Sequence, residues 1–137
     1  MGIREMIVLD TCAMIFDALD PNRLGRRARK EMDAASGNGT AACSDISLWE
    51  IAMLVAKGRL DPGTDAITFT DLLVTSRNLK VMPITPEIAH LSASYRGFTH
   101  ADPADRIIAS TALFMKAPLL TPDARLRAVK GLRVLWG

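Results

Sequence analysis

Four acidic residues lie far apart in this 137-residue sequence, and each follows a predicted strand or lies in a predicted helix. Two of them follow short apolar runs that predict strands, and two lie in segments with a helical pattern. In parallel α/β sheets the ligands bind beyond the carboxyl ends of the strands. We therefore expect the four carboxylates to meet at that edge of one sheet. Asp10 and Asp123 are the two that follow predicted strands, and Glu50 and Asp105 are the two in helical segments.

Carboxylates that converge from distant segments repel one another, which raises the pKa of some of them unless a cation neutralises them. A set of oxygen ligands selects hard ions such as Mg²⁺ or Mn²⁺ over zinc. These ions keep several waters, and they lower the pKa of a bound water so that it can attack a phosphodiester. The predicted chemistry is therefore metal-assisted phosphodiester hydrolysis.

Each of these acids also has a structural explanation. Asp10 could accept hydrogen bonds from the amides of the helix that follows it. Glu50 could close a capping box with Ser47. If Ser44 or Asp45 caps that helix instead, Glu50 lies one turn further in, among apolar neighbours, where an ionised carboxylate needs a cation or another partner.

The stretch 102–105 resembles a helix start, with Asp102 as the N-cap and proline in the first position. Asp105 then falls in the first turn, on the same stripe as Ile108, and is expected to point inward over the sheet. Asp123 could equally sit in the first turn of a short helix. Taken singly these acids are ambiguous, and together they favour a metal site.

The remaining pattern alternates short strands with helices, which predicts an α/β fold with a short, mainly parallel sheet covered on both sides. The first strand is a continuous apolar run, which is typical of a strand buried on both faces. Strands are predicted at 6–10, 40–43, 80–83, 118–120 and 132–135. Helices are predicted at 11–18, 22–35 (opening at Asp20-Pro21), 45–57, 64–76, 87–94, 103–116 and 123–129.

Size and composition set outer limits on the protein. The length predicts one domain over residues 1–137. The formal net charge of +2 says little about partners, although the basic residues of 23–30 could face a polyanion as well as solvent. Aromatic content of 5% argues against a surface built mainly for base stacking.

Cys12 and Cys43 lack the spacing of a zinc site or a disulfide framework, and both are predicted to be small buried core residues in a reducing compartment. No run approaches the roughly 18 apolar residues that would span a bilayer. We therefore expect a cytoplasmic protein.

The chain resembles the PIN domains, in particular the VapC toxins of bacterial toxin–antitoxin pairs. The resemblance covers essentially the whole chain and depends on four motifs in order: LDT at 9–11, SLWEIA at 47–52, HADPADRIIA at 100–109 and LLTPD at 119–123. It implies a three-layer α/β/α sandwich, dependence on Mg²⁺ or Mn²⁺, and cleavage of single-stranded RNA regions. It also implies a homodimer and neutralisation by a small cognate antitoxin protein.

The resemblance assigns roles to the residues of these motifs. Thr11 would help to hold Asp10 or a bound water, and Asp102 would support the helix that presents Asp105. Arg106 could contact a substrate phosphate or pair with a carboxylate. The implied catalytic and metal-binding residues are Asp10, Glu50, Asp105 and Asp123.

Two other classes of protein share part of this pattern. Phosphatases of the haloacid-dehalogenase type also end the first strand with Asp, but they carry a second Asp where this chain has Cys12. A catalytically silent PIN-like binding module would use the acids as caps and ion-pair partners.

His90 and His100 are not needed for a metal-activated water, and we expect them on a helix surface and in a loop. An antitoxin could block an acidic pocket by inserting Arg or Lys, or by displacing the metal. The RNA target and the number of metal ions do not follow from the sequence.

Overall fold

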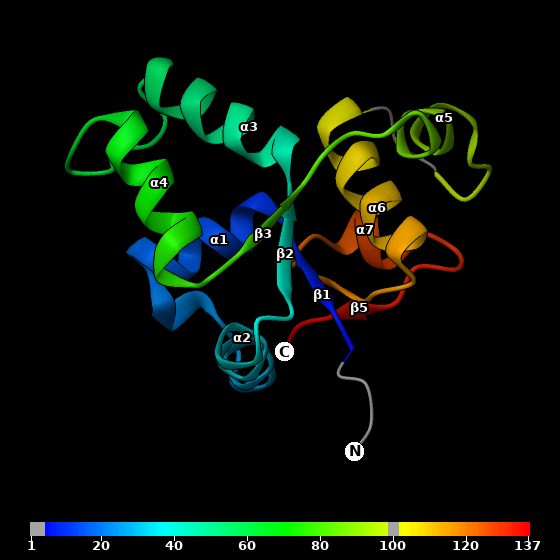
Figure 1. Cartoon of the computed structure of the whole chain (residues 1–137), viewed down its shortest axis with the longest axis horizontal. Helices are drawn as coiled ribbons and strands as arrows, with labels where there is room; N and C mark the ends of the chain where they lie inside the picture. The colour runs from blue at the N-terminus through cyan, green and yellow to red at the C-terminus, as the bar shows by residue number, and fades with distance from the viewer. Residues whose placement is uncertain (1–4, 99–101) are drawn as a thin grey trace.

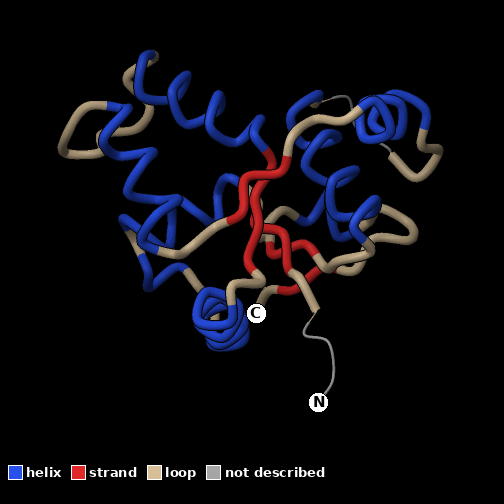
Figure 2. The backbone as a smooth tube through the Cα atoms, viewed as in Figure 1, coloured by secondary structure: helices blue, strands red, loops and turns tan. Residues whose placement is uncertain are grey.

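A five-stranded sheet runs through the centre of the computed structural model, which describes residues 5–98 and 102–137. The strand order is β3-β2-β1-β4-β5, and neighbouring strands are parallel (Figures 1 and 2). The predicted parallel α/β sheet is therefore confirmed. The strands are β1 (Ile7–Leu9), β2 (Ala41–Ser44), β3 (Lys80–Met82), β4 (Leu119–Leu120) and β5 (Val134–Leu135).

Helices cover both faces of this sheet, as the sandwich prediction requires. In Figure 1, α1, α2 and α4 lie on one side of the strands, and α6 and α7 lie on the other. The helices are α1 (Thr11–Leu19), α2 (Arg26–Asn38), α3 (Asp45–Ala56), α4 (Ala66–Ser76), α5 (Pro86–Ser94), α6 (Pro103–Met115) and α7 (Ala124–Arg127), with a 3-10 turn η1 (Pro21–Arg23).

The central strand β1 feeds two separate cores because successive side chains of a strand point to opposite faces. Ile7 and Leu9 pack with buried residues of α1, α2, α3 and α4. Val8, between them, packs with α6 and with Leu126 of α7. The strand is thus buried on both faces, as its continuous apolar run predicts.

The second helix differs from the prediction. Asp20-Pro21 opens only the turn η1, because Leu24 is extended (φ −78°, ψ 127°) and is buried in the core. Helix α2 therefore begins at Arg26 and continues to Asn38, beyond the predicted end at 35. Gly39 stops it in the left-handed conformation (φ 70°), which glycine adopts without a steric penalty.

The two cysteines are both free, but only one lies where it was predicted. Cys43 of β2 is fully buried. Cys12 is exposed, so its assignment to the core is wrong. Because Thr11, Ala13 and Met14 take the buried positions of α1, Cys12 falls on the outer side of this helix. Within residues 5–98 and 102–137, no helix is long and apolar enough to cross a membrane.

Arg77, at the carboxyl end of α4, connects three helices on one side of the sheet. Its Nε and Nη2 donate to the Asp17 carboxylate of α1 at 2.8 and 2.7 Å. Its Nη1 lies 2.9 Å from Asp33 Oδ1 of α2. Such forked contacts are among the stronger polar interactions of arginine. The Asp17 side chain is only 11% exposed, whereas that of Asp33 is 57% exposed.

Replacing Arg77 by Ala should therefore lower the free energy of unfolding by about 1.5–3 kcal/mol, because a largely buried carboxylate loses a charged hydrogen-bond partner. Urea denaturation followed by circular dichroism measures the change. Asp33→Ala is the matched control and should reduce it by no more than about 1 kcal/mol, since that pair is exposed. Equal losses in the two variants would contradict the importance assigned to Asp17.

Candidate functional site

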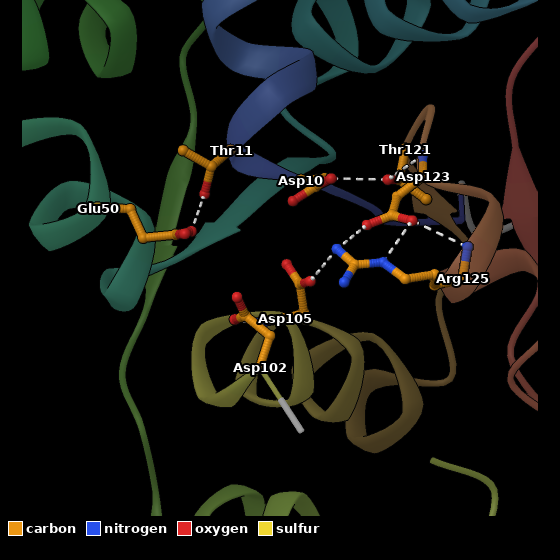
Figure 3. A network of polar contacts seen from close by, with 8 residues as sticks. All are labelled: Asp10, Thr11, Glu50, Asp102, Asp105, Thr121, Asp123 and Arg125. Atoms are coloured by element: carbon orange, nitrogen blue, oxygen red, sulfur yellow. Dashed lines mark hydrogen bonds and ion pairs between the residues drawn. The ribbon is translucent and has the colours of Figure 1, made fainter. Parts of the chain in front are cut away.

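The four predicted acids come together at the carboxyl edge of the sheet, each held there by a different element. Asp10 follows β1 directly and Asp123 is the N-cap of α7, just after β4. Glu50 lies in the second turn of α3, which starts where β2 ends, and Asp105 lies in the first turn of α6. Figure 3 shows their side chains directed toward a common space. The predicted convergence is therefore seen in the structure.

Asp10 is the most buried of these acids, with 4% of its surface exposed. The Thr121 hydroxyl donates to its Oδ2 at 2.6 Å. The pKa of Asp10 is raised to about 7; burial is the largest cause, the Thr121 hydrogen bond opposes it, and the charges of Asp105 and Glu50 add to it. A carboxyl so placed is poised between its protonated and ionised forms near neutral pH.

Glu50 is oriented by hydroxyl groups. The Thr11 hydroxyl donates to Glu50 Oε1 at 2.6 Å, and the Thr11 and Ser47 hydroxyl oxygens are hydrogen-bonded at 2.8 Å. Burial raises the pKa of Glu50, the Thr11 hydrogen bond opposes this, and the charges of Asp105 and Asp102 add to it. Ser44, not Ser47, caps α3 through the Ile46 amide, so the alternative capping box is not formed.

Thr11 thus supports a different acid from the one expected. Its hydroxyl holds Glu50, and only its backbone amide has a small effect on Asp10, whose pKa it lowers slightly. The hydroxyl that holds Asp10 belongs to Thr121, a residue of the LLTPD motif for which no role was predicted. In the sequence, a threonine between the predicted strand and Asp123 was the feature that could have indicated this role.

The start of α6 confirms the capping role of Asp102, whose Oδ1 accepts the Asp105 amide at 3.0 Å. The guanidinium carbon of Arg106 lies 5.1 Å from the centroid of the Phe98 ring. Its buried Nε finds no hydrogen-bond partner among the described residues. A role of Arg106 in phosphate binding stays a prediction. His90 lies on α5 and is exposed, and His100 is outside the described residues.

Arg125 of α7 is a residue of the site that the sequence did not single out. Its Nη2 lies 3.0 Å from Asp123 Oδ2 and 3.3 Å from Asp105 Oδ2. Its backbone amide and its Nε also donate to Asp123 Oδ1, at 2.8 and 3.3 Å. Figure 3 shows the guanidinium between the two carboxylates. A basic residue two positions after a candidate ligand was the signal in the sequence.

The thiol of Cys12 reports on the electrostatics of the whole cluster. Its pKa is raised to about 12, first by partial desolvation of the thiol, although the residue as a whole is exposed, and then by the negative charges of Asp10, Glu50, Asp105 and Asp123. All four acids therefore act on one point beside α1.

These residues fit a hard divalent cation in their chemistry, because all of their donor atoms are carboxylate oxygens. Asp10 and Glu50 are held by hydroxyl groups, and a cation would compensate their raised pKa values. In the part of the chain that the structure describes, no three acidic, histidine or cysteine side chains are close enough together to ligate one ion. Mg²⁺ usually binds through only one or two carboxylates and keeps its other waters, so a pair of these acids is enough to hold it.

Asp10→Asn should stabilise the metal-free protein at high pH. The unfolded chain loses this proton at about pH 4, whereas folded Asp10 keeps it to about pH 7. The folded state therefore binds more protons in this window, and stability falls as pH rises from about 4 to 7. Asn removes this loss, which is on the order of 2–4 kcal/mol.

Thermal unfolding in EDTA at pH 4.5 and pH 8 measures the effect. The variant should have the higher Tm at pH 8 and a Tm near the parent value at pH 4.5. Asp71→Asn, on the exposed side of α4, is the control and should show no such pH dependence. A Tm for Asp10→Asn below that of the parent at pH 8 would refute the burial argument.

Comparison with known proteins gives one family and one fold. A model of the PIN domain family matches residues 7–132. Ribonuclease VapC22 of Mycobacterium tuberculosis is 28% identical over 122 residues, covering 89% of this chain and 90% of that protein.

Solved structures agree with the family match. A chain in the crystal structure of VapBC2 from Rickettsia felis, bound to a DNA fragment from its promoter, superposes with a TM-score of 0.74 at 18% identity, covering 96% of this chain and 99% of that one. For DNA-bound VapBC from Salmonella typhimurium the TM-score is 0.69 at 20% identity, with 96% and 98% covered. The expected resemblance and the sandwich fold are thus confirmed, and the chain belongs to the PIN domain family.

Proposed function

We propose that this protein is a ribonuclease and the toxin of a toxin–antitoxin pair, and that it cleaves RNA with the help of Mg²⁺ or Mn²⁺. The observation that carries the proposal is the convergence of four carboxylates on one space, with Asp10 the most buried of them. The similarity to Ribonuclease VapC22 and to chains of VapBC complexes supports the choice of substrate and biological role.

The proposed catalytic and metal-binding residues are Asp10, Glu50, Asp105 and Asp123. A bound divalent cation would supply charge to stabilise the transferring phosphoryl group and would lower the pKa of an attacking water. Thr121 and Thr11 fix the orientations of the two inner carboxylates, Asp10 and Glu50. Glu50, whose carboxylate is oriented by the Thr11 hydroxyl, would accept a proton from the attacking water. Asp102 holds the first turn of α6 and thereby the backbone that presents Asp105.

An apolar cleft next to the acids supports single-stranded RNA as the substrate. It lies between α3 and α6, and Trp49 within it is 55% exposed. Bases of single-stranded RNA stack on such aromatic side chains, whereas a duplex keeps its bases covered. Its lining residues are Ile46, Trp49, Met53, Pro103, Ala104 and Ile107, together with Glu50 and Asp102 of the acidic site.

The proposed protein partners are a cognate antitoxin and a second copy of the chain. The homodimer depends on the resemblance to VapC toxins alone. For the antitoxin, an apolar groove between α3 and α4 offers a surface, with Ile67 on it 84% exposed. An antitoxin that also inserts Arg or Lys between the four carboxylates would block the site directly.

Cleavage of total RNA by the purified protein tests the proposed function. Discrete fragments are expected with Mg²⁺ or Mn²⁺ and not with EDTA. Asp10→Asn and Asp105→Asn should each slow cleavage by about a hundredfold or more, because charge stabilisation in the transition state is lost. Glu87→Gln, on the exposed surface of α5, should cleave at the parent rate.

Fragments that persist in EDTA or in both Asn variants would count against a metal-dependent site. Folded, antitoxin-free protein that cleaves nothing under any condition would favour the catalytically silent binding module instead.

The cleft makes a separate prediction about affinity. Trp49→Ala should weaken binding of a single-stranded oligoribonucleotide roughly five- to a hundredfold, since one base stacked on an aromatic contributes about 1–3 kcal/mol. Fluorescence anisotropy in the inactive Asp10→Asn background measures the affinity. Phe114→Ala is the control, because Phe114 is 49% exposed but is not part of the cleft. Unchanged affinity for Trp49→Ala would remove the cleft from the substrate site.

A further inference from the structure

Arg125 places a positive charge inside the proposed metal site. Of the four candidate ligands, Asp105 and Asp123 are both in contact with its guanidinium. We propose that Arg125 is a built-in counter-ion of the acidic site, and that a divalent cation binds only as this guanidinium leaves the two carboxylates. This inference rests on the proposed function, since it concerns the same metal site.

The contacts divide the site into two halves. Asp10 and Glu50 form the inner half and accept hydrogen bonds from threonine hydroxyls. Asp105 and Asp123 form the outer half, and the Nη2 of Arg125 bridges them at 3.3 and 3.0 Å. Since those two acids come from different helices, the bridge also holds the starts of α6 and α7 together. A divalent cation that used the outer carboxylates would take over this role.

The guanidinium competes for the same oxygen atoms that an ion would use. Asp123 Oδ2 and Asp105 Oδ2 each contact Arg125 Nη2, so an ion at either atom must share it with a positive charge or replace that charge. Arginine stays protonated at all ordinary pH values, so pH does not remove this charge. Displacement requires movement of the side chain.

That movement is sterically and energetically accessible. The side chain of Arg125 is 59% exposed and lies on a helix of four residues, so it can swing into solvent without opening the core. The side chains of Asp105 and Asp123 are only 14% and 21% exposed, but the guanidinium end of both ion pairs faces solvent. Solvent screens the attraction there, so these pairs are weaker than fully buried ones. Two such contacts hold the outer carboxylates ready, but they are weak enough for a divalent cation to replace them.

A second arginine of the same helix provides a matched comparison. Arg127 lies two residues further along α7, and its Nη2 donates to the Pro122 carbonyl oxygen at 3.3 Å. It carries the same charge on the same helix. A general effect of positive charge would therefore be felt from both arginines. Of these two arginines, the contacts described here place only Arg125 on the candidate ligand atoms.

Isothermal titration of Mn²⁺ into the metal-free protein tests the proposal without any measurement of activity. Arg125→Gln should bind Mn²⁺ about three- to tenfold more tightly than the parent, as expected from losing one or two exposed ion pairs. Arg127→Gln should stay within about twofold of the parent, on the same scale of exposed charges. In a parallel NMR titration with Mg²⁺, the Nε–H signal of Arg125 should shift and that of Arg127 should not.

Equal Mn²⁺ affinities of the parent and Arg125→Gln would overturn this inference and leave the proposed function intact. Weaker binding by Arg125→Gln would also overturn it, and would show that the arginine supports the ion rather than competing with it. If neither protein binds Mn²⁺ at all, and Asp10→Asn behaves like both, the metal-dependent function fails together with the inference.

Discussion

The burial of the Asp10 carboxylate at the end of the central strand is the constraint around which the site is arranged. The parallel register sets Leu9 opposite Cys43 of β2 and Leu120 of β4. Asp10, the residue directly after β1, therefore lies between the ends of two other strands. An ionised group there loses most of its hydration and needs compensation. The Thr121 hydroxyl donates a hydrogen bond to this carboxyl, whose pKa is raised to about 7. The neighbouring acids make the position suitable for a cation.

Helix starts make this concentration of acids tolerable. Asp10, Ser44, Asp102 and Asp123 are the N-caps of α1, α3, α6 and α7. The start of a helix carries partial positive charge from its unsatisfied amides, which favours nearby carboxylates. Capping and ligation were alternatives in the sequence, but the structure shows that a residue such as Asp123 can cap a helix and still face the site. The two roles are compatible because each carboxylate has two oxygen atoms.

The hydroxyl groups add orientation to this charge. Thr121 connects the end of β4 with Asp10, and Thr11 connects α1 with Glu50 of α3. Because these are contacts between elements rather than within them, the inner carboxylates are fixed by the packing of the sheet and its helices. A ligand meets a site whose inner half is already in place, which is the general requirement for a precise site. The outer half depends on side chains that are closer to solvent.

The sequence by itself determined the parallel sheet, most helix positions and the edge at which the acids meet. These features are local: a continuous apolar run predicts β1, Asp102-Pro103 predicts the start of α6, and Gly58 (φ 70°) follows the end of α3. The start of α2 was misplaced because it depends on Leu24 reaching the core, which is a tertiary contact.

Only the tertiary structure decided which acid is buried, which hydroxyl holds it, and which basic side chain lies beside the other acids. Thr121 and Asp10 are 111 residues apart in the sequence, and Arg125 and Asp105 are 20 apart. Periodicity and capping rules describe neighbours along a helix or strand, so they carry no information on such pairs. Desolvation likewise depends on every element packed around a group, and so the pKa of Asp10 follows from the fold and not from its motif.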